Sequence, residues 1–114
     1  MRLLVCGGRN YNDAKRIEEE IVKLAPTVII SGGASGADTH AIIEAQVLGI
    51  PVIVYMADWK KYGRRAGPIR NKQMLEEGKP DMVLAFPGGI GTANMIKQAK
   101  AAGIKVIEIE EETK

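Results

Sequence analysis

The stretch DMVLAFPGGIGTANM, which spans residues 81–95, decides the fold of this chain. Residues 82–86 are apolar without a polar interruption, a pattern typical of a strand buried on both faces of a sheet. A proline and three glycines at residues 87–91 end that strand before a helical pattern begins. The segment therefore predicts a strand that leads through a glycine turn into a helix.

A glycine turn of this kind is suited to binding an anion. Glycine accepts positive φ angles and lets a ligand approach the main chain, and the first amides of the following helix have no partner within the helix. Because those amides carry partial positive charge, the turn can accept a phosphate or a carboxylate. A tight turn without a ligand is the alternative interpretation. The same construction recurs at residues 7–10 and 32–36, and this repetition favours a binding role.

Composition limits the class of protein. A chain of 114 residues, 46% apolar and 26% charged, is typical of one globular domain covering residues 1–114. The apolar runs are too short to cross a bilayer and Arg2 leads into a strand-like run, so we expect a cytoplasmic protein without membrane contact. The net charge of +2 does not by itself indicate nucleic acid, although residues 60–72 contain six cations and no acid, and residues 108–112 contain four glutamates.

The rest of the chain alternates strands with helices. Apolar runs predict further strands at residues 3–6, 28–31, 52–55 and 106–109. Between them, apolar spacing and capping residues predict four helices. The first is capped by Asn12 or Asp13 and ended by Pro26, and the second runs from about Gly36 to Gly49 with Ala37, Ala41, Ala45 and Leu48 on one face. The third runs from Pro68 to Gly78, and the fourth stops near Gly103. Residues 57–66 are interpreted as a basic loop with one helical turn.

This alternation predicts an α/β fold, a doubly wound Rossmann-like parallel sheet with helices on both faces. We expect five strands in the order 3-2-1-4-5, a common order in this class. The winding then reverses between strands one and four, where the carboxyl ends of the strands open a crevice. All three glycine turns fall at that edge, so the sequence predicts a nucleotide-sized site that accepts an anion there.

Some residues argue against particular kinds of site. Cys6 ends a buried apolar run and is interpreted as a core residue, and one cysteine with one histidine does not supply a zinc site. None of the turns is a strict dinucleotide fingerprint or a Walker A loop. His40 is interpreted as structural. We therefore expect no metal and no cofactor.

Other residues leave two interpretations open. Arg70 and Lys72 fall in the first turns of a predicted helix, where the helix dipole disfavours cations, so either a bound anion compensates or both side chains point to solvent. Asp38, by contrast, is favourable at a helix start without any function. Trp59 and Tyr62 lie among basic residues, where they either stack on a base or pack the loop onto the domain.

Three motifs resemble the SLOG superfamily, which includes the lonely guy phosphoribohydrolases and the Rossmann-like core of DNA-processing protein A. They are SGGASGADTHA at residues 31–41, AGPIRNKQML at 66–75 and PGGIGT at 87–92. The GGR turn at residues 7–9 is similar to that of small stand-alone members of unknown function. The resemblance implies a Rossmann-like sheet, commonly a homodimer, and recognition of nucleotides or nucleotide-derived ligands. A lysine decarboxylase label on some relatives is discounted, because this sequence shows no pyridoxal-phosphate lysine site.

The resemblance also bears on catalysis. In the lonely guy enzymes an arginine, and a glutamate three residues beyond the GT of PGGxGT, carry the hydrolysis of an N-glycosidic bond. Arg70 matches that arginine, followed by Asn71 where the motif has lysine, whereas the glutamate position is Met95, preceded by Asn94. Hydrolysis develops positive charge on the sugar, which a carboxylate stabilises and a methionine does not. The phosphate-binding parts are retained, and the known catalytic carboxylate is missing.

We therefore expect a domain that binds a nucleotide or nucleotide-derived ligand, as a sensor or processing component and as a homodimer. One alternative is a nucleoside-monophosphate phosphoribohydrolase in which Arg70 and Asp38 are catalytic. Another is single-stranded DNA binding, which the small net charge disfavours. The expected ligand-binding residues are Gly7, Gly8, Arg9, Gly32, Gly33, Ser35, Gly36, Arg70, Pro87, Gly88, Gly89, Gly91 and Thr92.

Overall fold

The computed structural model describes residues 1–111, so Glu112 of the acidic tail lies outside the described residues. Five parallel strands form one sheet in the order β3-β2-β1-β4-β5, which confirms the predicted order. The strands are β1 (Arg2–Cys6), β2 (Val28–Ser31), β3 (Val52–Val54), β4 (Met82–Ala85) and β5 (Lys105–Glu108). The fifth strand begins one residue earlier than expected, and the third is one residue shorter.

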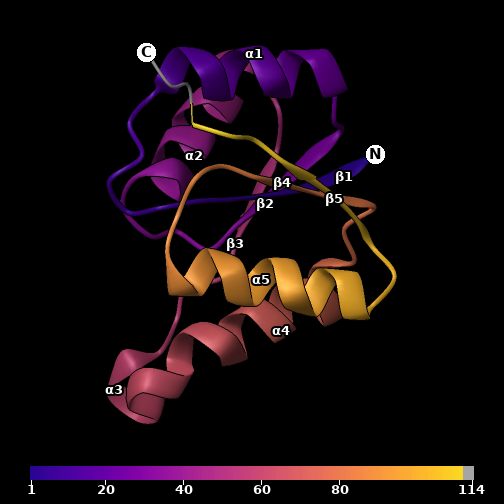
Figure 1. The fold of residues 1–114 in the computed structure, drawn as a ribbon. Helices are drawn as coiled ribbons and strands as arrows, with labels where there is room; N and C mark the ends of the chain where they lie inside the picture. Colours follow the sequence, from indigo (N-terminus) through magenta and orange to yellow (C-terminus); the bar gives the residue numbers. More distant parts are fainter. Residues whose placement is uncertain (112–114) are drawn as a thin grey trace.

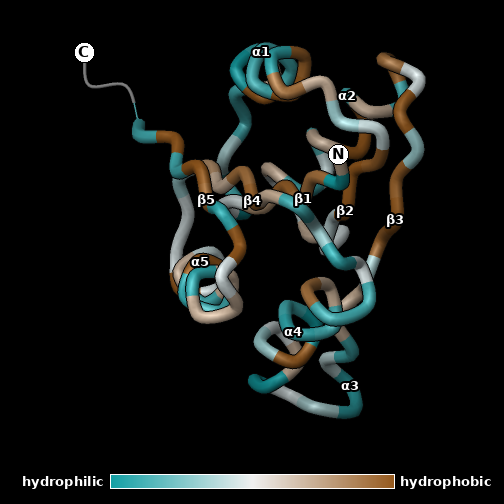
Figure 2. The backbone as a smooth tube through the Cα atoms, turned by 90° about the vertical axis from the view of Figure 1, so that its right-hand side faces the viewer, coloured by the Kyte–Doolittle hydropathy of each residue, from teal (hydrophilic) through white to brown (hydrophobic). Residues whose placement is uncertain are grey.

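Helices cover both faces of the sheet (Figures 1 and 2). α1 (Ala14–Leu24) and α2 (Ala37–Leu48) pack on one face, and α4 (Ala66–Gly78) and α5 (Ile90–Ala101) pack on the other. The segment expected to be a loop with one helical turn contains α3 (Trp59–Tyr62) and the 3-10 helix η1 (Gly63–Arg65). Both figures place α3 at the end of the molecule away from α1. The fold is therefore the doubly wound, Rossmann-like α/β arrangement.

The pleat of β1 divides its side chains between two cores. Leu3 and Val5 belong to the core beneath α1 and α2, whereas Leu4 and Cys6 belong to the core beneath α4 and α5, and all four are buried. Because helices cover both faces, the central strands require apolar residues at every position. This requirement explains the unbroken apolar runs in the sequence.

α2 approaches the sheet closely through small side chains. Ala37, Ala41 and Ala45 are fully buried, but Leu48, which we expected on the same face, is 38% exposed. That expectation was wrong because Leu48 is the last residue of the helix, and the chain leaves the core at the exposed Gly49, where φ is 73°. The left-handed end of the helix at Gly49 was predicted correctly.

The start of α4 differs from the prediction, whereas its predicted end at Gly78 is confirmed. The helix begins at Ala66, so Pro68 lies within its first turn, where a missing amide hydrogen is tolerated. At the other end Lys79, rather than a glycine, adopts the left-handed conformation with φ of 48°. Gly78 is instead a buried helical residue, and a Cβ there would lie 3.1 Å from Ile30 Cδ1. Its small size therefore lets α4 pack against β2.

The start of α2 provides a test of how tightly the turns are packed. Gly36 has φ of 78°, and an added Cβ would overlap the carbonyl oxygens of Gly8 and Arg9. We expect Gly36→Ala to lower the free energy of unfolding by about 3 to 5 kcal/mol, through backbone strain and a steric clash. Gly49→Ala is the matched control, because nothing lies within 4 Å of a Cβ at Gly49, and it should cost about 1 kcal/mol. Urea unfolding measures both, and equal losses would contradict the proposed close packing.

Candidate functional site

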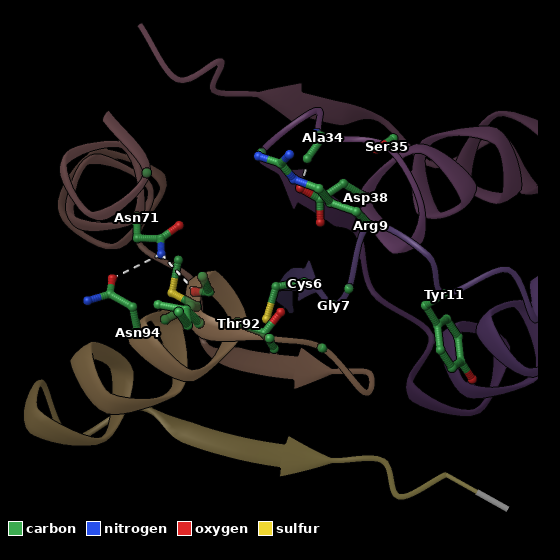
Figure 3. Close-up of a pocket in the computed structure, with 18 of the residues that line it drawn as sticks. Cys6, Gly7, Arg9, Tyr11, Ala34, Ser35, Asp38, Asn71, Thr92 and Asn94 are labelled. Atoms are coloured by element: carbon green, nitrogen blue, oxygen red, sulfur yellow. Dashed lines mark hydrogen bonds between the residues drawn. The ribbon is translucent and has the colours of Figure 1, made fainter. Parts of the chain in front are cut away.

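The carboxyl ends of β1, β2 and β4 open onto one pocket with a volume of about 1160 Å³ (Figure 3). The turns that follow these three strands and the first half of α4 form its walls. This is the edge at which the sequence predicted a crevice. The expected site residues that line the pocket are Gly7, Gly8, Arg9, Gly32, Gly33, Ser35, Asp38, Arg70, Pro87, Gly88, Gly89, Gly91 and Thr92. Gly36 does not line it and lies against the backbone of Gly8 and Arg9.

The peptide of Gly8 joins the three turns. Its N–H donates to the carbonyl oxygen of Pro87 at 2.9 Å, and its carbonyl oxygen accepts from the N–H groups of Ala37 at 3.1 Å and Tyr11 at 3.2 Å. The first turn is thus bonded both to the turn after β4 and to the start of α2. The turns after β1 and β4 lie so close together that a side chain does not fit between them, since a Cβ on Gly88 would lie 2.7 Å from the nitrogen of Gly8.

The glycines of these turns therefore fall into two classes. At Gly7, Gly8, Gly36 and Gly88 an added Cβ would collide with another part of the protein, whereas at Gly89 and Gly91 nothing lies within 4 Å. The first class lets the turns pack against one another. The second class leaves the start of α5 open to a ligand. Sequence reasoning assigned every one of them to ligand approach, because contacts between distant turns are not visible in a sequence.

Arg70 is fixed at the pocket wall by two hydrogen bonds. Its Nη1 donates to the carbonyl oxygen of Gly32 at 2.8 Å, and its Nε donates to Oδ1 of Asn71 at 3.1 Å. A Cβ on Gly32 would overlap Nη1, so a side chain there would displace the guanidinium from this position. Burial lowers the pKa of Arg70, and the charge of Arg9 lowers it further, whereas Asp38 raises it. The pocket therefore brings two guanidinium groups near each other.

Lys72, unlike Arg70, does not line the pocket. Because α4 begins at Ala66, both residues lie beyond its first turn, where the helix dipole has little effect. The helix dipole therefore gives little reason to expect an anion beside either side chain. Lys72 is exposed and lies 3.8 Å from Glu76, which matches the interpretation that it points to solvent. Arg70 lines the pocket instead.

Sequence analysis missed an amide network between α4 and α5. Nδ2 of the buried Asn71 donates to the carbonyl oxygen of Gly91 at 3.2 Å and to Oδ1 of Asn94 at 3.1 Å (Figure 3). Nε2 of Gln98 also donates to Oδ1 of Asn94, at 2.7 Å. The network connects Arg70 to the start of α5. The available signal was Asn94 and Gln98, whose spacing of four places two amides on one helix face.

Two buried titratable groups lie at the base of the pocket. Asp38 is 6% exposed, and its Oδ2 accepts a hydrogen bond from the N–H of Ala34 at 3.2 Å. Burial raises the pKa of Asp38 to about 6, although the bond from Ala34 and the charge of Arg70 act in the opposite direction. Burial likewise raises the pKa of the Cys6 thiol to about 12. Cys6 is therefore a neutral core residue near pH 7, as predicted.

Thr92 and Met95 mark two sides of the start of α5. Thr92 is 8% exposed and lines the pocket, and its hydroxyl has no hydrogen-bond partner among residues 1–111. Met95 also reaches the pocket, but it is buried in the core with Leu4, Cys6 and Met74. The position that holds a glutamate in the lonely guy enzymes is therefore part of the apolar core in this chain.

Apolar side chains form the rim of the pocket. Met56, Trp59 and Ile90 line it and are well exposed. Trp59 also lies against α4, since a Cβ on Gly67 would lie 3.4 Å from its Cη2 atom. This contact matches the interpretation that Trp59 packs the loop onto the domain. Trp59 nevertheless remains 51% exposed.

The part of the chain that the structure describes contains neither a metal-binding cluster nor a membrane-spanning helix. No group of three or more His, Cys, Asp or Glu side chains within residues 1–111 has the arrangement of a metal site. In the same range, each helix is too short or too polar to cross a membrane.

The raised pKa of Asp38 predicts how stability changes with pH. A carboxyl with a pKa of about 6 in the folded state and near 3.8 when unfolded binds its proton more tightly in the folded protein, so stability falls as pH rises between those values. Asp38→Asn removes this effect and keeps an acceptor for Ala34. We expect the variant to gain up to about 3 kcal/mol of stability relative to wild type between pH 4 and pH 7.5. Urea unfolding at both pH values measures it, and a difference independent of pH would contradict the assignment.

The chain is similar to a known protein family, to a phage protein and to a protein of solved structure. A family model described as YspA, cpYpsA-related SLOG family matches residues 1–62. The Gene 61 protein of Mycobacterium phage D29 is 32% identical over 118 residues, which cover 93% of this chain and 94% of that protein. DNA processing protein A from Streptococcus pneumoniae shares the fold, with a TM-score of 0.80 at 22% identity, over 97% of this chain and 50% of that one. The motifs, the matching family model and the phage relative together establish that the chain belongs to the YspA, cpYpsA-related SLOG family.

Proposed function

We propose that residues 1–114 form a single domain that binds a nucleotide or nucleotide-derived ligand. The observation that carries this proposal is the position of Arg70. Gly32 and Asn71 hold its guanidinium at the pocket, and its remaining N–H groups donate to no residue within 1–111. The carboxylate of Asp38 stabilises this partly buried cation, but the pocket holds a second arginine, Arg9, so a further negative partner would stabilise the two cations together. A phosphate is such a partner and matches the geometry of a guanidinium group.

The start of α5 supports the same location for the phosphate. α5 has 12 residues, and the N–H groups of its first turn have no acceptor within the helix. The hydroxyl of Thr92 lacks a partner in the described part of the chain, and Gly89 and Gly91 leave the approach open. The proposed phosphate position is therefore the turn at residues 88–92, facing Arg70 and Arg9 across the pocket.

The rest of the ligand would lie along the apolar rim. Met56 and Trp59 follow β3, on the side of the pocket formed by the second glycine turn. An aromatic face beside an anion-binding turn suits a nucleobase, because a base stacks on an indole while its phosphate is held elsewhere. This arrangement favours a nucleotide over a small inorganic anion.

We further propose that the protein acts in the cytoplasm as a sensor or processing component, and that it forms a homodimer. Family membership supports a role connected with nucleotides. The outer faces of α1 and α2 provide apolar residues for contact with a second copy, namely Val22, Ile43 and Val47, which are well exposed in the single chain.

Replacing Arg70 tests the phosphate contact. We expect Arg70→Ala to weaken binding of AMP by about 10- to 100-fold, because a hydrogen-bonded charge pair is lost, and to change binding of adenosine much less. Calorimetric titration of both ligands measures the difference. Arg65→Ala is the matched control, since Arg65 is exposed on η1 and does not line the pocket, yet its replacement changes the net charge equally. Equal losses for AMP and adenosine would reject the role of Arg70.

The enzyme alternative is hydrolysis of a nucleoside monophosphate at its N-glycosidic bond. Asp38 is the carboxylate available for it, because the family's glutamate position is occupied by the buried Met95. A Met95→Glu variant would place a carboxylate in the core and destabilise the fold, so it is unsuited to testing activity. Asp38→Asn is the more informative variant.

We expect little release of free base from a panel of nucleoside monophosphates. Loss of one electrostatic stabiliser typically reduces a rate about 100- to 1,000-fold, and a typical turnover is about 10 per second. Turnover by the wild-type protein should therefore stay below about 0.1 per second. Chromatographic detection of the free base measures it. Turnover near one per second that Asp38→Asn abolishes would overturn the binding-domain proposal in favour of the hydrolase.

A second candidate function is binding of single-stranded nucleic acid on the surface of α3 and η1. Lys60, Lys61, Arg64 and Arg65 are exposed there, next to the half-exposed Trp59. Cations beside aromatic faces are the usual means of holding an unpaired strand. The structural relative from Streptococcus pneumoniae is described as a DNA processing protein. Such binding would weaken steeply as salt increases, which distinguishes it from a small-molecule site.

A further inference from the structure

The pocket contains a negative group that a phosphate site does not explain. Asp38 lines the pocket near Arg70, and a Cβ on Gly32 would lie 3.0 Å from Asp38 Oδ2 and would overlap Arg70 Nη1. An ionised carboxylate only accepts hydrogen bonds, so it repels a phosphate. Its presence in the same pocket as two arginines therefore indicates a ligand with a second, different kind of polar group.

A purely structural role uses only half of the carboxylate. Oδ2 accepts from the N–H of Ala34, and this bond fixes the turn before α2. Oδ1 accepts from no residue within 1–111, and because no fully buried side-chain oxygen in that range lacks a partner, Oδ1 is open to solvent. The charge of Asp38 also stabilises the charged form of Arg70, but neither role uses Oδ1 as a hydrogen-bond acceptor. Figure 3 shows the Asp38 carboxylate inside the pocket, beside Arg9 and Ala34.

We propose that Asp38 is a specificity-determining residue that accepts a hydrogen bond from a ribose hydroxyl, so that the ligand of this pocket is a ribonucleotide. This inference rests on the proposed function. A sugar hydroxyl is a neutral donor that a nucleotide carries close to its phosphate, and one free carboxylate oxygen is suited to it. A carboxylate near the second strand binds the ribose hydroxyls in the dinucleotide-binding folds by the same chemistry. The amides of α5 and the two arginines then hold the phosphate, while Asp38 selects the sugar.

The test compares ribonucleotides with their deoxy analogues. AMP, 2′-deoxy-AMP and 3′-deoxy-AMP are titrated into wild-type protein at pH 8, where Asp38 is ionised. We expect at least one deoxy analogue to bind about 10- to 100-fold more weakly than AMP, because a hydrogen bond to a charged acceptor is lost. In Asp38→Asn this preference should fall to within about threefold, while affinity for inorganic pyrophosphate does not decrease.

The control variant is Asp58→Asn. Asp58 also accepts a hydrogen bond from a backbone N–H, that of Lys61 at 3.1 Å, but it does not line the pocket. It should retain the full preference for AMP. Urea unfolding shows whether Asp38→Asn is folded, and if it is not, the comparison of the three ligands on wild-type protein decides alone.

Three negative results are possible, and they bear on two different claims. Equal affinity of the wild-type protein for AMP and both deoxy analogues would overturn the role of Asp38 and leave the proposed nucleotide site in place. A preference for AMP that survives in a folded Asp38→Asn variant would overturn it as well. If neither AMP nor pyrophosphate binds the wild-type protein, the proposed function fails and this inference fails with it.

Discussion

The arrangement of the pocket depends on the hydrogen bonds made by the peptide of Gly8. This one residue follows β1, the central strand, and bonds to Pro87 after β4 and to Ala37 at the start of α2. Each bond is worth only about 1 kcal/mol, so their importance is geometric. They bring three turns that are distant in sequence into contact at the point where the winding of the sheet reverses. Without this contact the carboxyl ends of the strands would open onto solvent rather than onto a formed pocket.

That close contact explains Gly7, Gly8, Gly36 and Gly88 among the glycines near the pocket. A side chain at Gly8 or Gly36 would collide with the backbone of a neighbouring turn, which is a structural requirement and carries no information about a ligand. Only Gly89 and Gly91 leave open space, and both lie at the start of α5. The amide network from Asn71 then sets the position of Arg70 relative to that helix start. The structure thus separates the residues that build the pocket from those available to a ligand.

The fold could be predicted from the sequence because the patterns that determine it, apolar strands and amphipathic helices, are local in the chain. Unbroken apolar runs identify strands covered on both faces, and their alternation with helices fixes a parallel sheet whose carboxyl ends meet at one edge. Leu48 and the start of α4 were predicted wrongly, since they depend on where packing partners end. The role of Asn71 depends on contacts between α4 and α5, and the position of Asp38 beside Arg70 depends on the approach of α4 to the turn after β2. No pattern within a single helix reveals them.

The two kinds of charge in the pocket partly compensate for each other. Burial disfavours both the ionised Asp38 and the charged Arg70, and each is stabilised by the charge of the other. Each side chain keeps hydrogen-bonding atoms that residues 1–111 do not use, and because no fully buried side-chain atom in that range lacks a partner, these atoms are open to solvent and to a ligand. Such a pair is expected where stability is lower in exchange for recognition. A ligand that carries both an anion and a neutral donor would satisfy the cation and the carboxylate together, whereas a simple anion would satisfy only the first.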